Sequence, residues 1–395
     1  MSEPTGNYQF QTAGKIIAGP HAIQRLGHAL TGAGQASRAL IVASDTMRKR
    51  GVTDEIAALL AQRGIASEAI GGVMREPTAD HIEQLADRVG KEHFDVYIGI
   101  GGGSVLDATK LLSVLRTNRL GVREMIGTEL ITGEGIPTVL IPTTSGTGSE
   151  ATPNAIVTLA EEKLKIGIVS RHLLPRLVVL DPVLTLGLPK PITAATGMDA
   201  FTHALESYIS NKANPISDML ALESIRLISR SIVPAFHNGS SLEDRSAMLL
   251  GSMLGGMALA GSGTAAVHAM AYPLGGRFNI PHGAANAMLL PHVMAFNLDR
   301  IRDKLEIVAA AMGIAKEPGR PAAAAERVIE RIAEWTEELE IPQDLTAYGV
   351  QAADIPSLSA AAFNVRRLMD NNPKPVSTGQ IEAVYRKLLP REAIK

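Results

Sequence analysis

The sequence predicts two domains, an α/β domain with a parallel sheet in the first half of the chain and an all-helical domain in the second half. Short apolar runs alternate with amphipathic stretches up to about residue 187, and the hydrophobic period is helical thereafter. A length of 395 residues fits two domains, and 46% hydrophobic with 20% charged residues is an ordinary globular composition. Disordered, collagen-like and fibrous proteins are therefore excluded.

Strands and helices alternate through the first half. Apolar, β-branched runs predict strands, and stretches with apolar residues three and four positions apart predict helices. The βαβαβ order that results implies a parallel sheet with helices on both faces. In chain order the predicted elements are a strand at 38–43, a helix at 52–63, a strand at 65–70, a helix at 78–92, strands at 95–100 and 138–141, a hairpin within 155–170 and a buried strand at 177–180.

The pattern changes after Asp181-Pro182 and becomes almost wholly helical in period. We therefore divide the chain into a domain of residues 1–187 and a domain of residues 188–395. The helical stretches of the second domain are 192–210, 216–232, 242–257, 267–274 and 284–296.

Charge and cysteine content exclude several functions. The chain has 38 Lys and Arg against 40 Asp and Glu, so its net charge of -2 predicts no attraction to nucleic acid or to an anionic membrane. With no cysteine, disulfides, thiolate metal sites and cysteine nucleophiles are excluded, and metal binding is left to His, Asp and Glu. The chain lacks a run of eighteen apolar residues and a secretory-type start, so we expect a cytoplasmic protein.

A glycine-rich loop connects the strand at 95–100 to a helix. Its residues are Gly101, Gly102, Gly103 and Ser104. Glycines at such a turn let backbone N–H groups approach a phosphate at the positive end of the following helix, and Ser104 can cap that helix or donate to a phosphate oxygen. The spacing is not that of the dinucleotide fingerprint, and a purely structural turn is the alternative.

Two further features lie where strands of the first domain end. Residues 142–150 form a second loop of small and hydroxyl residues, which is either a ligand contact at the same sheet edge or a polar surface turn. Asp45 follows the strand at 38–43, and a carboxylate there can accept hydrogen bonds from ribose hydroxyls and repel a 2′-phosphate. Asp45 thus favours NAD over NADP, and the alternative interpretation is that Asp45 only caps the helix that follows.

An Asp/His set marks the second domain. Asp199 and His203 are four residues apart and so share one helix face, and His268 and His282 occur further along. One carboxylate and three imidazoles suit Fe²⁺ or Zn²⁺, although a single such His more often only hydrogen-bonds a carbonyl. Glu206, three residues after His203, is either a partner of an imidazole or a solvated charge.

Together these motifs resemble one family. The glycine loop with Asp107 and Lys110 resembles a GGGSxxDxxK pattern, and residues 142–150 resemble PTTxGTxxE. The metal-binding segments of the same family resemble residues 180–206, 268–276 and 281–283 of this chain. On these residues the chain is similar, over essentially its whole length, to the iron-containing (group III) alcohol dehydrogenases.

The resemblance implies a Rossmann-like N-terminal domain and an all-α C-terminal domain, which is the fold of dehydroquinate synthase and iron alcohol dehydrogenase, with an active site between them. It implies metal ligation by Asp199, His203, His268 and His282. Contacts to NAD are implied at Asp45, Gly101, Gly102, Gly103, Ser104, Thr143, Thr144, Thr147 and Lys165. From sequence alone Lys165 is only a charge on an exposed strand.

One residue departs from the family pattern. Many members carry a second His four residues after the third ligand, where this chain has Tyr272. The spacing from His268 holds Tyr272 near the metal, so its hydroxyl orients a substrate or passes a proton, or the residue only lines the pocket. We take His268 and Tyr272 as the candidate catalytic residues.

The expected activity is metal-assisted hydride transfer between NAD and a small primary alcohol or diol and its aldehyde. Alternatives are a maleylacetate reductase-like or glycerol dehydrogenase-like enzyme, a dehydroquinate synthase-like lyase, and a non-catalytic nucleotide-binding module. We expect no nucleic acid or membrane partner. A homodimer or larger homo-oligomer is expected, in which the first strand around residues 14–18 can pair between subunits.

Overall fold

The computed structural model describes residues 7–31, 36–162, 164–315 and 323–390. These residues form two compact units, which we call the α/β unit and the helical unit. The α/β unit consists of Gln11–Thr144 and Gly148–Leu186, and the helical unit consists mainly of Gly187–Lys395 and includes Ser145–Thr147. The predicted fold class, a parallel-sheet α/β part followed by a helical part, is confirmed.

A six-stranded, wholly parallel sheet forms the centre of the α/β unit, in the order β1-β9-β6-β4-β2-β3. Ile41 lies opposite Ile98, and Ile98 lies opposite Val139, so the three central strands are in register through their apolar residues. The strands are β1 (Ile16–Ala18), β2 (Arg38–Ala43), β3 (Ala66–Ile70), β4 (Val96–Gly101), β6 (Thr138–Pro142) and β9 (Leu177–Leu180).

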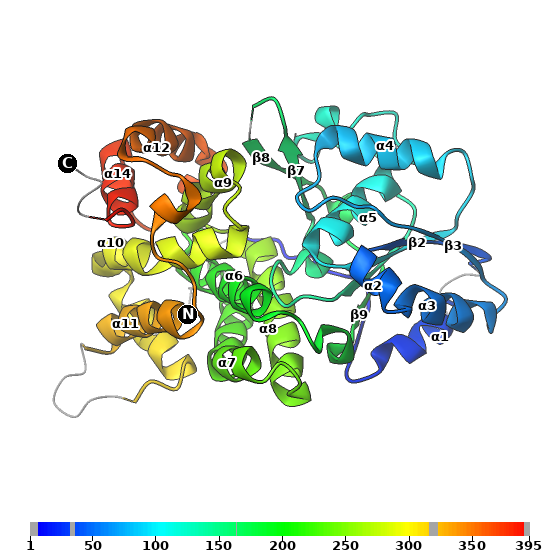
Figure 1. Cartoon of the computed structure of the whole chain (residues 1–395), viewed down its shortest axis with the longest axis horizontal. Coiled ribbons are helices and arrows are strands. Elements are labelled where there is room, and N and C mark those ends of the chain that lie inside the picture. The colour runs from blue at the N-terminus through cyan, green and yellow to red at the C-terminus, as the bar shows by residue number, and fades with distance from the viewer. Residues whose placement is uncertain (1–6, 32–35, 163, 316–322, 391–395) are drawn as a thin grey trace. The chain divides into compact units, whose positions relative to one another are not determined.

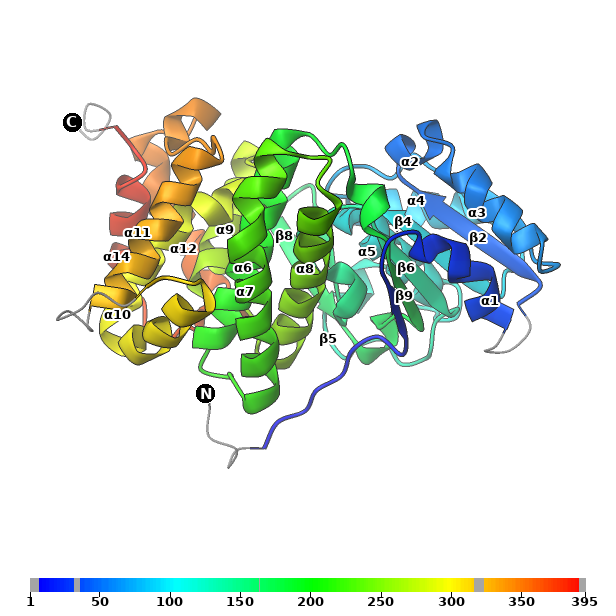
Figure 2. The same cartoon turned by 90° about the horizontal axis from the view of Figure 1, so that it is seen from below.

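Both faces of this sheet are buried. Ile41 belongs to the cluster on one face, whereas Leu40 and Val42 belong to the cluster on the other, as the two-residue period of a strand requires. Figures 1 and 2 show α1 and α3 along the first face and α4 and α5 along the second. The helices of the unit are α1 (Leu26–Thr31), α2 (Asp45–Lys49), α3 (Val52–Ala61), α4 (Ala79–Val89) and α5 (Gly103–Leu115).

A second, three-stranded sheet covers part of the face that carries α5. Its order is β5-β8-β7, and β7 and β8 form the predicted antiparallel hairpin. Val157 and Ile168 of this hairpin pack into the same cluster as Leu111 of α5. The strands are β5 (Gly127–Thr128), β7 (Asn154–Leu159) and β8 (Leu164–Val169).

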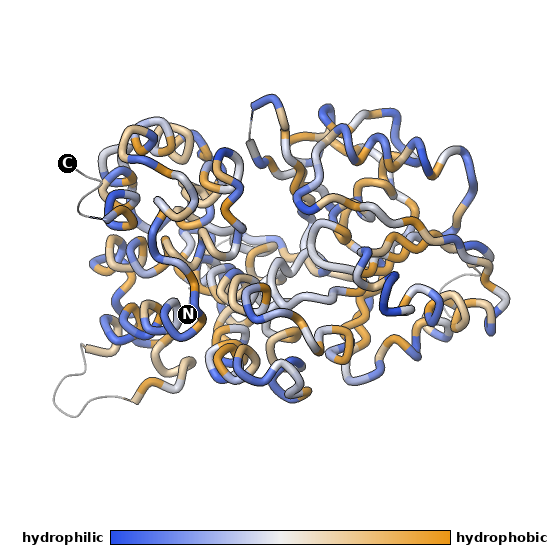
Figure 3. Tube along the Cα trace, viewed as in Figure 1, coloured by the Kyte–Doolittle hydropathy of each residue, from blue (hydrophilic) through white to orange (hydrophobic). Residues whose placement is uncertain are grey.

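The helical unit has one continuous apolar core, in which Phe201 and Trp335 meet edge to face at 5.0 Å between ring centroids. Figure 3 shows hydrophobic and hydrophilic residues alternating along its outer helices. The helices are α6 (Lys190–Ile209), α7 (Pro215–His237), α8 (Leu242–Ser262), α9 (Ala266–Phe278), α10 (His282–Ala311), α11 (Ala323–Glu338), α12 (Ile355–Asn364), α13 (Arg366–Met369) and α14 (Thr378–Arg386).

Within the described residues, no single helix is long and apolar enough to cross a membrane. The helices α8 and α9 reach that length and hydropathy only when they are taken together, and they are bent by 107° at the break between them.

A close helix contact sets the geometry of the helical unit where α10 begins. A Cβ atom on Gly283 would fall well inside contact distance of the Ala195 carbonyl oxygen and 3.1 Å from the Cβ of Asp199. Glycine therefore lets α10 approach α6 backbone to backbone. His282 and Asp199 are brought together by this approach, because each is next to the contact in its own helix.

We predict that Gly283→Ala destabilises the protein by about 1–3 kcal/mol, because the added methyl group forces α10 away from α6. Gly379→Ala is the matched control, because its Cβ would meet nothing within 4 Å, and it should stabilise α14 by about 0.5–1 kcal/mol. Urea unfolding of both variants measures the difference. Equal stability of Gly283→Ala and the parent protein would show that the contact is not tight.

Candidate active site

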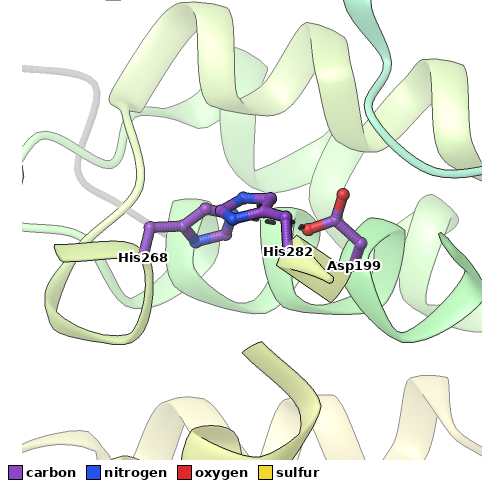
Figure 4. Close-up of side chains that lie close together, drawn as sticks. All are labelled: Asp199, His268 and His282. Atoms are coloured by element: carbon purple, nitrogen blue, oxygen red, sulfur yellow. Dashed lines mark ion pairs between the residues drawn. The ribbon is translucent and has the colours of Figure 1, made fainter. Parts of the chain in front are cut away.

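Asp199, His268 and His282 point toward one another from α6, α9 and α10 (Figure 4). Their ligand atoms all lie within 4.8 Å of one another. The Oδ1 atom of Asp199 is 3.8 Å from Nε2 of His268 and 3.7 Å from Nε2 of His282. Three predicted ligands, 83 residues apart at the extremes, thus converge on one point.

His203, the fourth predicted ligand, lies beside this group. Its Nε2 atom is 3.9 Å from Oδ1 of Asp199, and its ring stacks on that of His268 with centroids 4.6 Å apart. The other ring nitrogen, Nδ1, is 3.3 Å from the carbonyl oxygen of Gly146. Nε2 is therefore the nitrogen that faces the Asp199 carboxylate.

Glu206 fixes the orientation of His268. Its carboxylate lies 2.6 Å from Nδ1 of His268 and accepts hydrogen bonds from the backbone N–H groups of Ala265 and Val267 at 3.0 and 2.7 Å. Because a carboxylate only accepts, Nδ1 donates a hydrogen bond to Glu206, and Nε2 is the nitrogen that faces Asp199. The sequence suggested that Glu206 could partner an imidazole, and the imidazole in question is that of His268.

Two more side chains complete the surroundings of the group. Asn286, one helical turn after His282, is fully buried, and its Nδ2 atom lies 2.7 Å from Oδ1 of Asp199. Tyr272 is buried, and its ring centroid is 5.8 Å from that of His282. Sequence analysis did not select Asn286, although its i,i+4 spacing from His282 is the signal that found the Asp199 and His203 pair.

Burial and mutual contact set the charges of the group. Burial alone raises the pKa of the Asp199 carboxyl, but the three nearby imidazoles and the Asn286 amide together lower it, so Asp199 is ionised. Burial lowers the pKa of His203 to about 4, which leaves its imidazole neutral at pH 7. The site therefore presents a carboxylate and a neutral imidazole, as metal ligation requires.

In the α/β unit, the glycine loop begins α5 at the end of β4. Cβ atoms on Gly99 and Gly101 would lie 2.5 Å from Thr109 and 2.8 Å from Val105, so these two glycines are needed for packing α5 on β4. The N-cap residue is Gly102, which has no side chain that could accept a hydrogen bond from the first turn of α5. Ser104 does not cap the helix, because its Oγ accepts a hydrogen bond from the N–H of Glu76 at 3.1 Å.

Lys165 differs from the exposed strand charge that its sequence context suggests. Only 6% of the residue is exposed, and its Nζ atom forms an ion pair with Glu76 at 2.6 Å. Glu76 has a φ of 56°, an uncommon conformation for a residue other than glycine, and its N–H donates to Ser104 of the glycine loop. Glu76, which sequence analysis missed, thus links Lys165 to that loop.

The remaining predicted nucleotide contacts fall in different places. Thr144 adjoins the glycine loop, since a Cβ on Gly102 would be 3.5 Å from its hydroxyl, and the N–H of Thr143 donates to the carbonyl of Gly101. Asp45 is the first residue of α2 after the cap Ser44, and its carboxylate accepts a hydrogen bond from the N–H of Gly72 at 3.4 Å. Thr147 belongs to the helical unit.

A buried cluster of charges holds α5 in place. Lys110 donates to the carbonyl oxygens of Thr152 and Asn154 at 3.0 and 2.8 Å, and its Nζ lies 3.9 Å from Oδ1 of Asp107. Burial lowers the pKa of Lys110 to about 8 and raises that of Glu150 to about 7. Asp107 and Lys110, the charged residues of the glycine-loop motif, therefore position that loop within the α/β unit.

Family models match this chain in two parts. The model for iron-containing alcohol dehydrogenase covers residues 13–182, and the model for the C-terminal part of the Fe-containing alcohol dehydrogenase family covers residues 193–389. Long-chain-alcohol dehydrogenase 1 of Geobacillus thermodenitrificans (strain NG80-2) is 37% identical over 353 residues, 89% of each chain.

The chain belongs to the iron-containing alcohol dehydrogenase family.

Other relatives agree with this membership. The 1,3-propanediol dehydrogenase of Citrobacter freundii is 37% identical over 93% of this chain and 95% of its own. The solved structure of a 1,3-propanediol oxidoreductase is 35% identical, covers 97% of this chain and 100% of its own, and has a TM-score of 0.93. This member of the family is therefore an oxidoreductase that acts on CH–OH groups, and the family implies a metal and typically NAD.

We predict that Glu206→Gln weakens metal binding about 10- to 100-fold, because the amide no longer holds the His268 imidazole as the carboxylate does. Competition with a chromophoric chelator measures the affinity. Glu223→Gln is the control, because Glu223 is a half-exposed residue of α7 that pairs with Arg226. An unchanged metal affinity in Glu206→Gln would show that Glu206 only caps the start of α9.

We predict that Glu150→Gln changes the pH dependence of stability. Burial raises the pKa of Glu150 from 4.5 to about 7, so the folded protein keeps a proton that the unfolded chain has lost. The parent protein should thus lose stability as pH rises from 4.5 to about 7, and the variant should lose less. Melting temperatures across this range, with the exposed Glu161→Gln as control, measure the slopes, and parallel curves for Glu150→Gln and the parent would contradict the prediction.

Proposed function

We propose that this enzyme interconverts a small primary alcohol or diol and its aldehyde, with NAD as the hydride carrier and one divalent metal ion, Fe²⁺ or alternatively Zn²⁺. The ligands proposed are Asp199, His203, His268 and His282. The observation that carries the proposal is that Nε2 of each of the three histidines lies 3.7 to 3.9 Å from one oxygen of Asp199.

The arrangement of these residues fits a metal ion. Ligand atoms about 2.1 Å from one ion in a tetrahedral arrangement lie about 3.4 Å apart, which is close to the separations seen here. A carboxylate with three imidazoles is a donor set for Fe²⁺ or Zn²⁺. The acceptors are also buried together, since Asp199 and His268 expose 5% and 3% of their side chains. A buried carboxylate surrounded by imidazole nitrogens is stabilised by a positive partner.

When bound, the ion supplies positive charge that stabilises negative charge on the substrate oxygen, and NAD supplies the hydride acceptor. The chain contributes orientation. Glu206 holds His268 in the tautomer that turns Nε2 inward, and the Gly146 carbonyl does the same for His203. We assign to Tyr272 the role of orienting the substrate hydroxyl, because its ring lies beside that of His282.

The α/β unit supports nucleotide binding. The first turn of α5 has no side-chain cap, which suits a pyrophosphate at this helix start, and the proposed contacts there are Gly101, Gly102, Gly103 and Ser104. The buried cation of Lys165 and the hydroxyls of Thr143 and Thr144 are further proposed contacts. Thr147 and Asp45 complete the set, and the Asp45 carboxylate, at the end of the second strand, favours NAD over NADP.

The named activities of the relatives support the substrate class. They include dehydrogenases for long-chain alcohols and 1,3-propanediol and a lactaldehyde reductase of Escherichia coli (strain K12) that is 33% identical over 88% of this chain. We further propose a cytoplasmic homodimer or larger homo-oligomer with domains at residues 1–187 and 188–395. The strand β1 supports the oligomer, because it is an edge strand of the large sheet.

The test is NADH formation from NAD⁺ by chelator-stripped protein that is reloaded with Fe²⁺ or Zn²⁺ under anaerobic conditions. The panel contains short primary alcohols, diols and glycerol. We expect activity to vanish with the metal and to return with it, and to fall to background in Asp199→Ala and His282→Ala. His237→Ala, which alters an exposed histidine at the end of α7, should retain full activity. Turnover that survives complete metal removal would overturn the proposal.

A further inference from the structure

The proposed metal site contains a fifth residue whose role differs from that of a ligand. The Nδ2 atom of Asn286 lies 2.7 Å from Oδ1 of Asp199, 3.2 Å from Nε2 of His268 and 3.3 Å from Nε2 of His282. One amide nitrogen therefore faces three of the four atoms that the ion would bind. Asn286 is fully buried on α10, one turn after His282.

The amide can face this group only with its nitrogen. Oδ1 of Asp199 accepts and cannot donate, and at 2.7 Å it is the nearest of the three atoms to the amide nitrogen. Turning the amide by 180° would place its oxygen against this carboxylate oxygen, so the hydrogen-bond network assigns the nitrogen to this position.

The other end of the amide shows the cost of this orientation. The Oδ1 atom of Asn286 is buried and has no hydrogen-bond partner among the residues that the structure describes. A buried carbonyl oxygen without a partner is unfavourable. The amide nevertheless keeps its nitrogen inward, so the contacts with the converging acceptors determine its orientation.

We propose that Asn286 holds the metal site assembled when no ion is bound, and that its amide competes with the ion for the same lone pairs. The inference rests on the proposed metal site. The N–H groups of the amide contact polar atoms that would otherwise face one another in a buried group. An ion that enters must replace these hydrogen bonds, so Asn286 stabilises the metal-free protein and weakens metal affinity.

The experiment measures Zn²⁺ affinity by chelator competition, and melting temperature with and without Zn²⁺, in Asn286→Ala and Asn286→Leu. Leucine matches asparagine in shape and has no N–H group. We expect both variants to melt at a lower temperature than the parent when they are stripped of metal. We also expect them to bind Zn²⁺ roughly tenfold more tightly, because the ion no longer has to displace about one hydrogen bond of the amide.

Asn297→Ala is the matched control. Asn297 is equally buried on the same helix, and its amide pairs with that of Asn372 at 2.9 and 2.8 Å. Its loss should lower the melting temperature equally with and without Zn²⁺ and leave the affinity unchanged. Loss of packing alone would give Asn286→Ala the same behaviour.

The outcomes separate the inference from the proposed function. Unchanged Zn²⁺ affinity in both Asn286 variants would make Asn286 a packing residue, and weaker affinity would make it a support of the bound ion. Either result overturns the inference while the metal site stands. If the parent protein binds neither Zn²⁺ nor Fe²⁺, the proposed site itself fails. The Leu variant keeps the test decisive if the Ala variant does not fold.

Discussion

The burial of the Asp199 carboxylate is the constraint on which the helical unit depends. A carboxylate removed from water is costly unless charged or polar groups surround it. Here the surrounding groups come from α9 and α10 as well as from α6, so these helices can pack only where each delivers its side chain. The glycine at position 283 permits the required approach. Packing and electrostatics thus specify one arrangement.

The buried carboxylates of this protein have different structural roles, which depend on the groups that contact each of them. Asp199 faces imidazoles and an amide, whereas Glu206 faces backbone N–H groups at the start of α9 and one imidazole nitrogen. In the α/β unit Asp107 receives the Ser149 hydroxyl and the N–H of Ile156, which ties α5 to the following loop. These contacts hold the start of α5 in place through charges that need not touch a ligand.

The order of the elements and the convergence of Asp199, His268 and His282 could be predicted from the sequence, because both leave periodic or motif-level signals along the chain. Lys165 could not be placed, because its burial depends on Glu76, which is 89 positions earlier. The i,i+3 spacing put Glu206 near His203, but the carboxylate reaches across to α9 and binds His268 instead. The length of α10 was underestimated, because the predicted stretch 284–296 stops well before the helix ends at Ala311.

The proposed metal site raises a question of folding, because its members are buried together. With no ion bound, a carboxylate and three imidazoles would have to be packed together without the positive charge that stabilises them. A neutral donor at the centre removes the conflict without adding a permanent charge. The helix α10 carries both His282 and Asn286, one turn apart, so the element that delivers a ligand also delivers the donor. Folding and metal binding can then be successive steps.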